Sequence, residues 1–156
     1  ATYAKAMGNG YPAAAVATLQ ILRDTDALET IHATGRRMQD GLKEILNPKG
    51  LPYHFTGHPS MFGIMFREEV ASEYRDWATT DHELYDAIAN GMRLRGAMPE
   101  PDSREPWFMC EAHAKGDLVD RALTAFSDSL DAALEDRAHG AGAPHPHGGM
   151  SAPGDD

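Results

Sequence analysis

The period with which apolar residues recur along the chain is the feature that most limits its fold. Three segments repeat apolar residues every three or four positions, as an amphipathic helix does: 26–46, 80–96 and 117–134. Three shorter runs have the length and apolar content of strands: 51–56, 60–66 and 107–110. An alanine-rich stretch, 13–22, adds a helix that we expect to be buried. The order of these segments predicts an α/β domain of the layered α+β kind.

Polar residues mark where three of the helices begin. Asp26 is followed three residues later by Glu29, and Thr80 by Glu83, which is the spacing of a capping box. Asp117 precedes the last helical segment and is a favourable N-cap residue. We therefore expect these side chains to bind the free N–H groups of the first helical turns.

Charge and cysteine content exclude several classes of partner. The formal net charge is -10, so a nucleic-acid backbone or an anionic membrane would repel the chain. No apolar run approaches the length of a membrane span, and nothing resembles a signal peptide. The one cysteine, Cys110, forms no disulfide within the chain and fits a reducing compartment. We expect a soluble, cytoplasmic protein with no nucleic-acid or membrane partner.

The last residues, 135–156, differ in composition from the rest. They are rich in glycine, proline and alanine and have almost nothing to bury, so we expect a disordered tail. The histidines of the tail, His139, His145 and His147, stand without a thiol or a fixed ligand spacing. We therefore expect no metal site.

Several chemically distinctive residues are expected to be structural. His113 precedes the last helix, where a hydrogen-bonded structural histidine is favoured over a catalytic one. Cys110 has no nearby histidine or basic residue in the sequence to stabilise a thiolate, which argues against a role as a nucleophile. Five methionines are expected to fill the core: Met61, Met65, Met92, Met98 and Met109.

The stretch most informative about chemistry is AKAMGNGYP, residues 4–12. Lys5 lies among small and apolar residues and is followed by two glycines, an asparagine and a proline. Glycines let a backbone approach a ligand closely, and a partly desolvated lysine amine is a nucleophile towards aldehydes. The alternative is a solvated lysine before an ordinary loop. Because the sequence reaches this turn within a few residues of Ala1, we expect a fragment of a longer protein.

This stretch resembles the active-site lysine region of class III aminotransferases, pyridoxal-phosphate enzymes of fold type I that include the glutamate-1-semialdehyde aminomutases. The likeness continues in the family's order through three later segments: AAAVATLQILRDTDALETIHATGRRMQDGLKEIL, GHPSMFGIMF and RLRGAMPEPDSREPWFMCEAHAKGDLVDRALTAFSDSLDAAL. It covers nearly all of residues 1–134. The resemblance implies that residues 1–12 end a large cofactor-binding domain, and that residues 13–134 form the C-terminal small domain of an enzyme that is a homodimer in this family.

The resemblance also implies roles for particular residues. Lys5 would hold the pyridoxal 5'-phosphate cofactor as its internal aldimine and carry the proton of the 1,3-shift. Glu105 lies where aminomutase-like members keep a glutamate near the substrate entrance, and the alternative is a solvated loop carboxylate. Arg104 beside it would meet a substrate carboxylate, although a surface arginine is the favoured interpretation.

Three departures from the family pattern stand out. The large domain that precedes the lysine is missing from the sequence, and with it go the aspartate, glycine-rich turn and stacking aromatic that hold the cofactor. The stretch that normally follows the GNGYP turn and reaches the other subunit's cofactor has no counterpart after Pro12. The turn itself is less glycine-rich than in glutamate-1-semialdehyde aminomutases, which favours a sister group.

The expected function is amino-group transfer between an amino acid or amine and a keto acid or aldehyde. Two alternatives stay open. One is the intramolecular aminomutase of tetrapyrrole synthesis, which needs no second keto acid. The other is a non-catalytic truncated remnant or interaction module.

Overall fold

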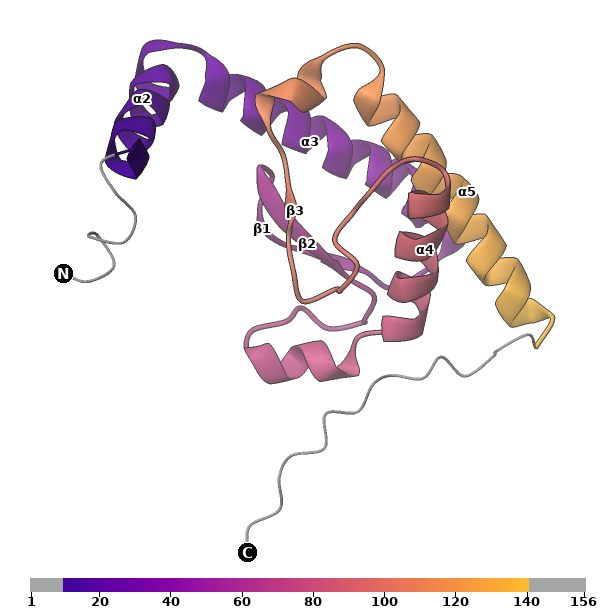
Figure 1. Cartoon of the computed structure of the whole chain (residues 1–156). Coiled ribbons are helices and arrows are strands. Elements are labelled where there is room, and N and C mark those ends of the chain that lie inside the picture. The colour runs from indigo at the N-terminus through magenta and orange to yellow at the C-terminus, as the bar shows by residue number, and fades with distance from the viewer. Residues whose placement is uncertain (1–9, 141–156) are drawn as a thin grey trace, which may run out of the picture.

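A computed structural model describes residues 10–140, which form a small antiparallel sheet with helices against it (Figure 1). The strands are β1 (His54–His58), β2 (Met61–Met65) and β3 (Trp107–Phe108). The α-helices are α2 (Gly10–Asp24), α3 (Ala27–Leu46), α4 (His82–Leu94) and α5 (Leu118–Ala138). Three short 3-10 helices join them: η1 (Asn47–Lys49), η2 (Tyr74–Thr79) and η3 (Glu111–Ala114). The order of elements matches the predicted order of helices and strands, and the antiparallel sheet makes the domain α+β.

The sheet has the strand order β1-β2-β3, and both pairs are antiparallel. β1 and β2 form a hairpin in which His58 lies opposite Met61. The sequence predicted a turn over 57–59, but β1 continues to His58 because Gly57 takes a left-handed φ of 81° within the strand. β3 pairs with β2 through Trp107 and Phe62, so the predicted strand 107–110 is shortened to two residues.

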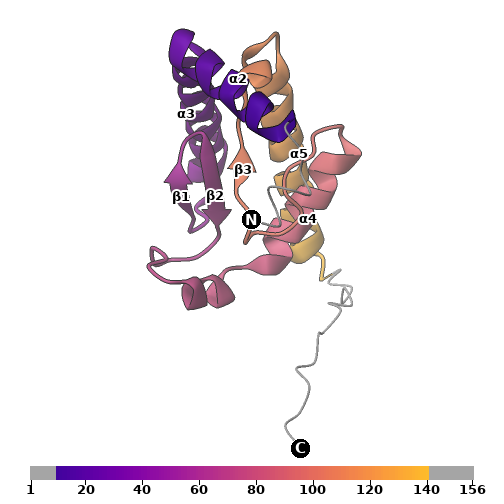
Figure 2. The ribbon, with the colours of Figure 1, turned by 60° about the vertical axis from the view of Figure 1, so that its left-hand side comes forward.

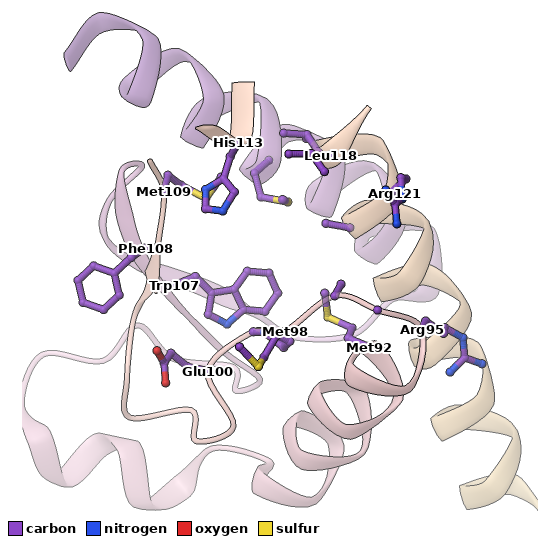
Figure 3. A pocket seen from close by; sticks show the side chains of 16 residues that line it. Met92, Arg95, Met98, Glu100, Trp107, Phe108, Met109, His113, Leu118 and Arg121 are labelled. Carbon is purple, nitrogen blue, oxygen red and sulfur yellow. The ribbon is translucent and has the colours of Figure 1, made fainter. Parts of the chain in front are cut away.

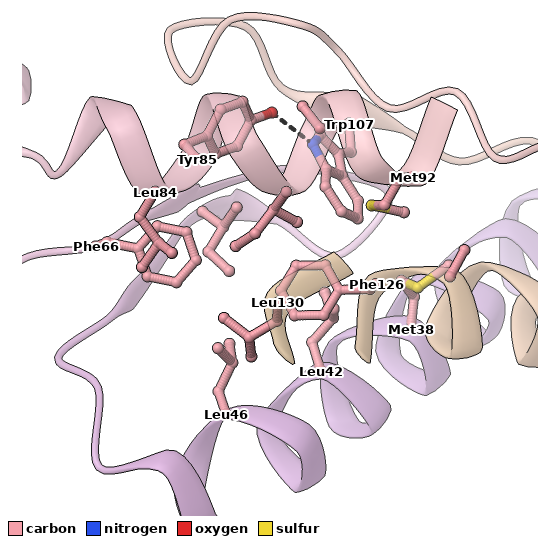
Figure 4. Packing of buried hydrophobic residues seen from close by; sticks show 14 of the residues in the cluster. Met38, Leu42, Leu46, Phe66, Leu84, Tyr85, Met92, Trp107, Phe126 and Leu130 are labelled. Carbon is pink, nitrogen blue, oxygen red and sulfur yellow. Dashed lines mark hydrogen bonds between the residues drawn. The ribbon is translucent and has the colours of Figure 1, made fainter. Parts of the chain in front are cut away.

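One face of the sheet, covered by α3, α4 and α5, holds the hydrophobic core (Figure 4). Phe62 and Ile64 point into this core from β2, as alternate residues of a strand do. The helical period predicted the core faces of α3 and α5 correctly for their most buried leucines, Leu42, Leu46 and Leu130. α3 sits against the hairpin turn at Gly35, where an added Cβ atom would lie 2.0 Å from the carbonyl oxygen of Pro59. Only glycine permits this approach.

α2 departs from the prediction of a buried helix. It leaves the N-terminal end of α3 as an arm (Figures 1 and 2), and the side chains of residues 12–21 are exposed. Val16, Leu19 and Ile21 are each more than half exposed, with Leu19 at 66%. The alanine-rich composition favours a helix, but burial also needs a packing partner, and the described residues supply none for this face.

Two limits predicted from the sequence fall inside helices. α2 begins at Gly10, so the last residues of the GNGYP run form a helical turn and the predicted boundary after Pro12 falls inside a helix. α5 continues to Ala138, four residues into the predicted tail of 135–156. Leu134, at the end of the predicted domain, still packs against the core. Residues 141–156, with His145 and His147, lie outside the described residues.

The predicted caps are only partly correct. Asp26 and Asp117 stand at the N-cap positions of α3 and α5, but neither side chain makes a capping hydrogen bond. The cap of α4 is Asp81 in place of Thr80, because the carboxylate of Asp81 accepts the backbone N–H of Leu84 at 3.0 Å. The hydroxyl of Thr80 is buried and has no hydrogen-bond partner among residues 10–140.

The methionines divide between core and surface. Met92 is buried as predicted, and Met65 and Met109 are half-buried. Met61 and Met98 are exposed, so the prediction that they fill the core was wrong for these two. Met61 lies on the strand face opposite Phe62 and Ile64, and Met98 lies in the loop after α4. Within residues 10–140, no helix is long and apolar enough to cross a bilayer.

Candidate functional site

The loop from α4 to β3, residues 95–106, carries both Arg104 and Glu105. Hydrogen bonds through Tyr85 of α4 hold this loop and the start of β3 in place. The indole N–H of Trp107 donates to the phenol oxygen of Tyr85 at 2.9 Å (Figure 4). Tyr85 in turn donates to the carbonyl oxygen of Glu100 at 2.8 Å. Burial raises the pKa of Tyr85 to about 12, so the phenol stays protonated and remains a donor.

The last part of the loop contacts η2 through Trp77. The indole N–H of Trp77 donates to the hydroxyl of Ser103 at 2.8 Å, and Ser103 is buried. The guanidinium of Arg104 lies 4.9 Å from the centre of the Trp77 ring, within cation–π range. It also pairs with Asp102, and this hydrogen bond lowers the pKa of the Asp102 carboxyl below its usual range.

Arg104 therefore has its charge satisfied inside the loop. A substrate carboxylate would have to displace Asp102 to reach it, which agrees with the surface-arginine interpretation. Glu105 follows on an exposed turn, where its backbone N–H donates to the carbonyl of Asp102 at 3.0 Å. Among the described residues, nothing pairs with the Glu105 carboxylate, so it points to solvent or to a group outside this part of the chain.

His113 and Cys110 meet at the start of η3. The backbone N–H of Cys110 donates to Nδ1 of His113 at 3.0 Å, which confirms His113 as a hydrogen-bonded histidine. The Cys110 sulfur lies 3.5 Å from the same nitrogen. The expectation that Cys110 has no histidine nearby was therefore wrong, since the first turn of η3 brings His113 back over it.

A cavity of about 340 Å³ opens beside this pair, between α3, the loop after α4, β3 and the start of α5 (Figure 3). Its walls are mostly apolar, with the indole of Trp107 and the side chains of Met38 and Met92 among them. His113, Glu100 and Arg121 supply polar groups around it. Sequence reasoning missed this cavity because its wall residues come from α3, α4, β3, η3, α5 and the loop after α4. The unusual number of methionines was the available signal.

Pyridoxal phosphate is attached through a lysine amine. Among residues 10–140, no lysine lines the cavity. Lys5 lies outside the described residues, and the other described lysines are surface residues of which Lys43 and Lys49 pair with Asp40 and Asp131. A shallower hollow beside Arg95 and Thr124, also within residues 10–140, likewise has no lysine in its wall.

Known proteins similar to the chain decide its family. No protein-family model matches it. A glutamate-1-semialdehyde 2,1-aminomutase of Thermus thermophilus is 33% identical over 119 residues, which is 76% of this chain and 28% of that protein. The enzyme of the same name from Aquifex aeolicus is 27% identical over 113 residues, which is 72% of this chain and 26% of that protein. The chain belongs to the class III pyridoxal-phosphate aminotransferase family.

Solved structures of this class III aminotransferase family share the fold. The internal aldimine form of the FumI protein of Sphingopyxis sp. MTA144 superposes with a TM-score of 0.68 at 30% identity. The match covers 87% of this chain and 29% of that one. An omega-transaminase from Sphaerobacter thermophilus superposes with a TM-score of 0.57 at 22% identity, over 68% of this chain and 24% of that one, which supports the fold alone. The chain spans 28% of the length of the first curated relative, so it corresponds to a segment of the full family architecture.

Proposed function

We propose that the chain is the C-terminal small-domain segment of a pyridoxal-phosphate-dependent class III aminotransferase, and that Lys5 is the residue that binds the cofactor. The observation that carries the proposal is the superposition on FumI over 87% of the chain, since the matched structure is a pyridoxal-phosphate form. In this assignment residues 1–12 end the large domain and the rest, as far as the end of α5, is the small domain.

The proposed reaction is transfer of an amino group between an amino acid or amine and a keto acid or aldehyde. The bound cofactor would act as the electron sink. The large domain and a second subunit would complete the site in a cytoplasmic homodimer. Glu105 is proposed to face the substrate entrance. Its carboxylate is exposed and has no partner among residues 10–140, which supports this role.

A second candidate is intramolecular amine transfer, because the curated relatives from two strains of Thermus thermophilus and from Aquifex aeolicus are glutamate-1-semialdehyde 2,1-aminomutases. The aminomutase reaction returns the amine to the same molecule and needs no keto acid. A turnover assay with glutamate semialdehyde as the only substrate separates the two reactions. The third candidate is a remnant that binds no cofactor.

The test of Lys5 is an absorbance titration of the purified chain with pyridoxal phosphate, followed by borohydride reduction and peptide mass spectrometry. We expect a visible band and a cofactor adduct on Lys5 that are both lost in Lys5→Ala. Lys115→Ala is the matched control, because Lys115 is exposed and lies outside the lysine turn. No band, or a band unaffected by Lys5→Ala, would leave the non-catalytic remnant as the function of this chain.

A further inference from the structure

The cavity beside β3 has an enclosed floor and an open mouth. Its floor includes Trp107, Met92 and Met38, which are exposed by 8% or less. Its mouth includes Phe108, Leu118 and Met98, which are exposed by 41% to 87%. Small-molecule pockets have volumes of about 300–1,000 Å³ and mostly apolar walls. This cavity, at about 340 Å³, suits a compact apolar molecule.

The two arginines that border the cavity differ in how they are engaged. Arg95 donates to the carbonyl oxygen of Gly91 at 3.1 Å and lies 3.9 Å from the carboxylate of Asp128, so its charge is already used. The guanidinium of Arg121 has no hydrogen-bond or ion-pair partner among residues 10–140. An unpaired guanidinium at the border of an apolar cavity favours an anionic ligand.

His113 adds a hydrogen-bond donor on the same side. Because its Nδ1 accepts the N–H of Cys110, the proton of the neutral ring is on Nε2. Figure 3 shows His113, Leu118 and Arg121 along one border of the cavity. Glu100 lies at the other border, beside Trp107 and Phe108. The charges are therefore separated, and a carboxylate would be held on the side of Arg121 and away from Glu100.

We propose that this cavity binds a small apolar carboxylate, with its hydrocarbon or aromatic body against Trp107 and the methionines and its carboxylate towards Arg121 and His113. Methionine side chains adapt to differently shaped apolar groups, so the cavity selects for charge and size more than for one exact shape. This proposal is argued from described residues alone and does not rest on the proposed role of Lys5.

The test uses the two tryptophan indole N–H signals in a ¹H–¹⁵N spectrum of the full chain. Trp107 is in the cavity wall and Trp77 is not, so Trp77 serves as an internal reference. The ligands are 4-phenylbutyrate and 4-phenylbutylamine, which share one body and differ in charge. We expect 4-phenylbutyrate to shift the Trp107 signal saturably, leave Trp77 unchanged, and bind about tenfold more tightly than the amine. The variant Trp77→Phe assigns the signals.

Two variants check that the cavity and its cation are responsible. Arg121→Gln should remove the preference for the carboxylate, whereas Arg36→Gln, an exposed arginine on α3, should preserve it. Ala122→Phe, which puts a ring at the cavity wall, should block both ligands while the circular dichroism spectrum still reports a folded chain. The proposal is overturned if both indole signals drift together without saturation, if the amine binds equally well, or if Arg121→Gln behaves like Arg36→Gln.

Discussion

The indole of Trp107 and the phenol of Tyr85 form a buried hydrogen bond of 2.9 Å that joins β3 to α4. The Tyr85 hydroxyl also donates to the backbone carbonyl of Glu100, so α4 is hydrogen-bonded to the loop as well. One phenol oxygen thus satisfies both a donor and an acceptor that would otherwise be unpaired in the core. The position of the loop that carries Glu105 depends on this oxygen.

Replacing Tyr85 with phenylalanine should therefore destabilise the domain. The variant leaves the Trp107 N–H and the Glu100 carbonyl without partners while keeping the packed ring, and the expected loss is about 2 kcal/mol of unfolding free energy. Urea denaturation measures it. Tyr74→Phe is the control, since Tyr74 is 71% exposed and its change should stay within about 0.5 kcal/mol. Equal effects of the two variants would contradict the role given to the Tyr85 hydroxyl.

The same phenol gives the domain a stability change at high pH. Burial raises the pKa of Tyr85 to about 12 in the folded chain, above its ordinary value in the unfolded chain. Between these two pKa values the unfolded state binds fewer protons, so stability falls as pH rises above about 10. We expect the difference in unfolding free energy between the wild type and Tyr85→Phe to shrink over this interval. A constant difference from about pH 8 to about pH 12 would show that Tyr85 titrates normally.

The ion pair between Arg137 and Asp81 should stabilise α4 and the end of α5 together. The two terminal guanidinium nitrogens of Arg137 each donate to one oxygen of the Asp81 carboxylate at 2.6 Å, and this carboxylate also accepts the backbone N–H of Leu84. We expect Asp81→Ala to cost about 1–2 kcal/mol and Arg137→Gln less, because the second change keeps the cap. Thermal denaturation compares them. If Arg137→Gln were the more harmful, the cap would not be the main contribution of Asp81.

This carboxylate also gives an acid dependence. The hydrogen bond from Arg137 holds the pKa of Asp81 below its usual range. The stabilisation is therefore present above the ordinary aspartate pKa and is lost as pH falls through the lower folded value. The difference between wild type and Asp81→Ala, measured by urea denaturation from about pH 7 down to about pH 2.5, should shrink at the acid end. A difference that did not change over this range would contradict the lowered pKa.

Gly35 should not tolerate alanine, although it lies inside a helix. In an exposed helix this change would stabilise by about 1 kcal/mol. Here the new methyl group would meet the Pro59 carbonyl at 2.0 Å, so α3 would have to move off the hairpin. We expect a net loss of about 2 kcal/mol or more in urea denaturation. The control Ala33→Gly, at an exposed position on the same helix, should cost only about 1 kcal/mol.

The exposed apolar side chains of α2 should make the isolated chain associate. Val16, Leu19 and Ile21 are each more than half exposed on an arm that the described residues leave largely uncovered. Sedimentation velocity over a concentration series should show self-association that Leu19→Glu weakens. Ala33→Glu, an exposed change on α3, should leave it intact. A wild-type chain that stays monomeric throughout the series would contradict this expectation.

The order of helices and strands, which is set largely by residues close in the sequence, was predicted correctly, whereas features set by contacts between distant segments were not. The period of Met38, Leu42 and Leu46 is a local signal, and it placed α3 and its buried face correctly. The burial of α2 depends on what packs against it, which no local signal contains. The cap of α4 moved from Thr80 to Asp81 because side-chain geometry, and not residue type, decides which oxygen reaches the helix.

The candidate site was less accessible to sequence reasoning than the fold. Glu105 is predicted as a site residue only through the resemblance to a family pattern. That its carboxylate has no partner among the described residues is seen only in the structure. The approach of His113 to Cys110 follows from one turn of η3, because a spacing of three residues brings the two side chains together only once that turn is known. The cavity beside Trp107 unites residues far apart in the chain, so no spacing rule describes it.

The brevity of β3 has a consequence for how the domain folds. The β1–β2 hairpin closes over a two-residue turn, whereas β3 reaches β2 only after η2, α4 and the whole loop have been placed. Bringing such distant strands together costs more chain entropy than closing the hairpin. In exchange, only the two residues of β3 form pairs with β2. We expect β3 and its loop to dock last during folding. Within the sheet, β3 should then open before the hairpin does, and its amide hydrogens should exchange before those of β1 and β2.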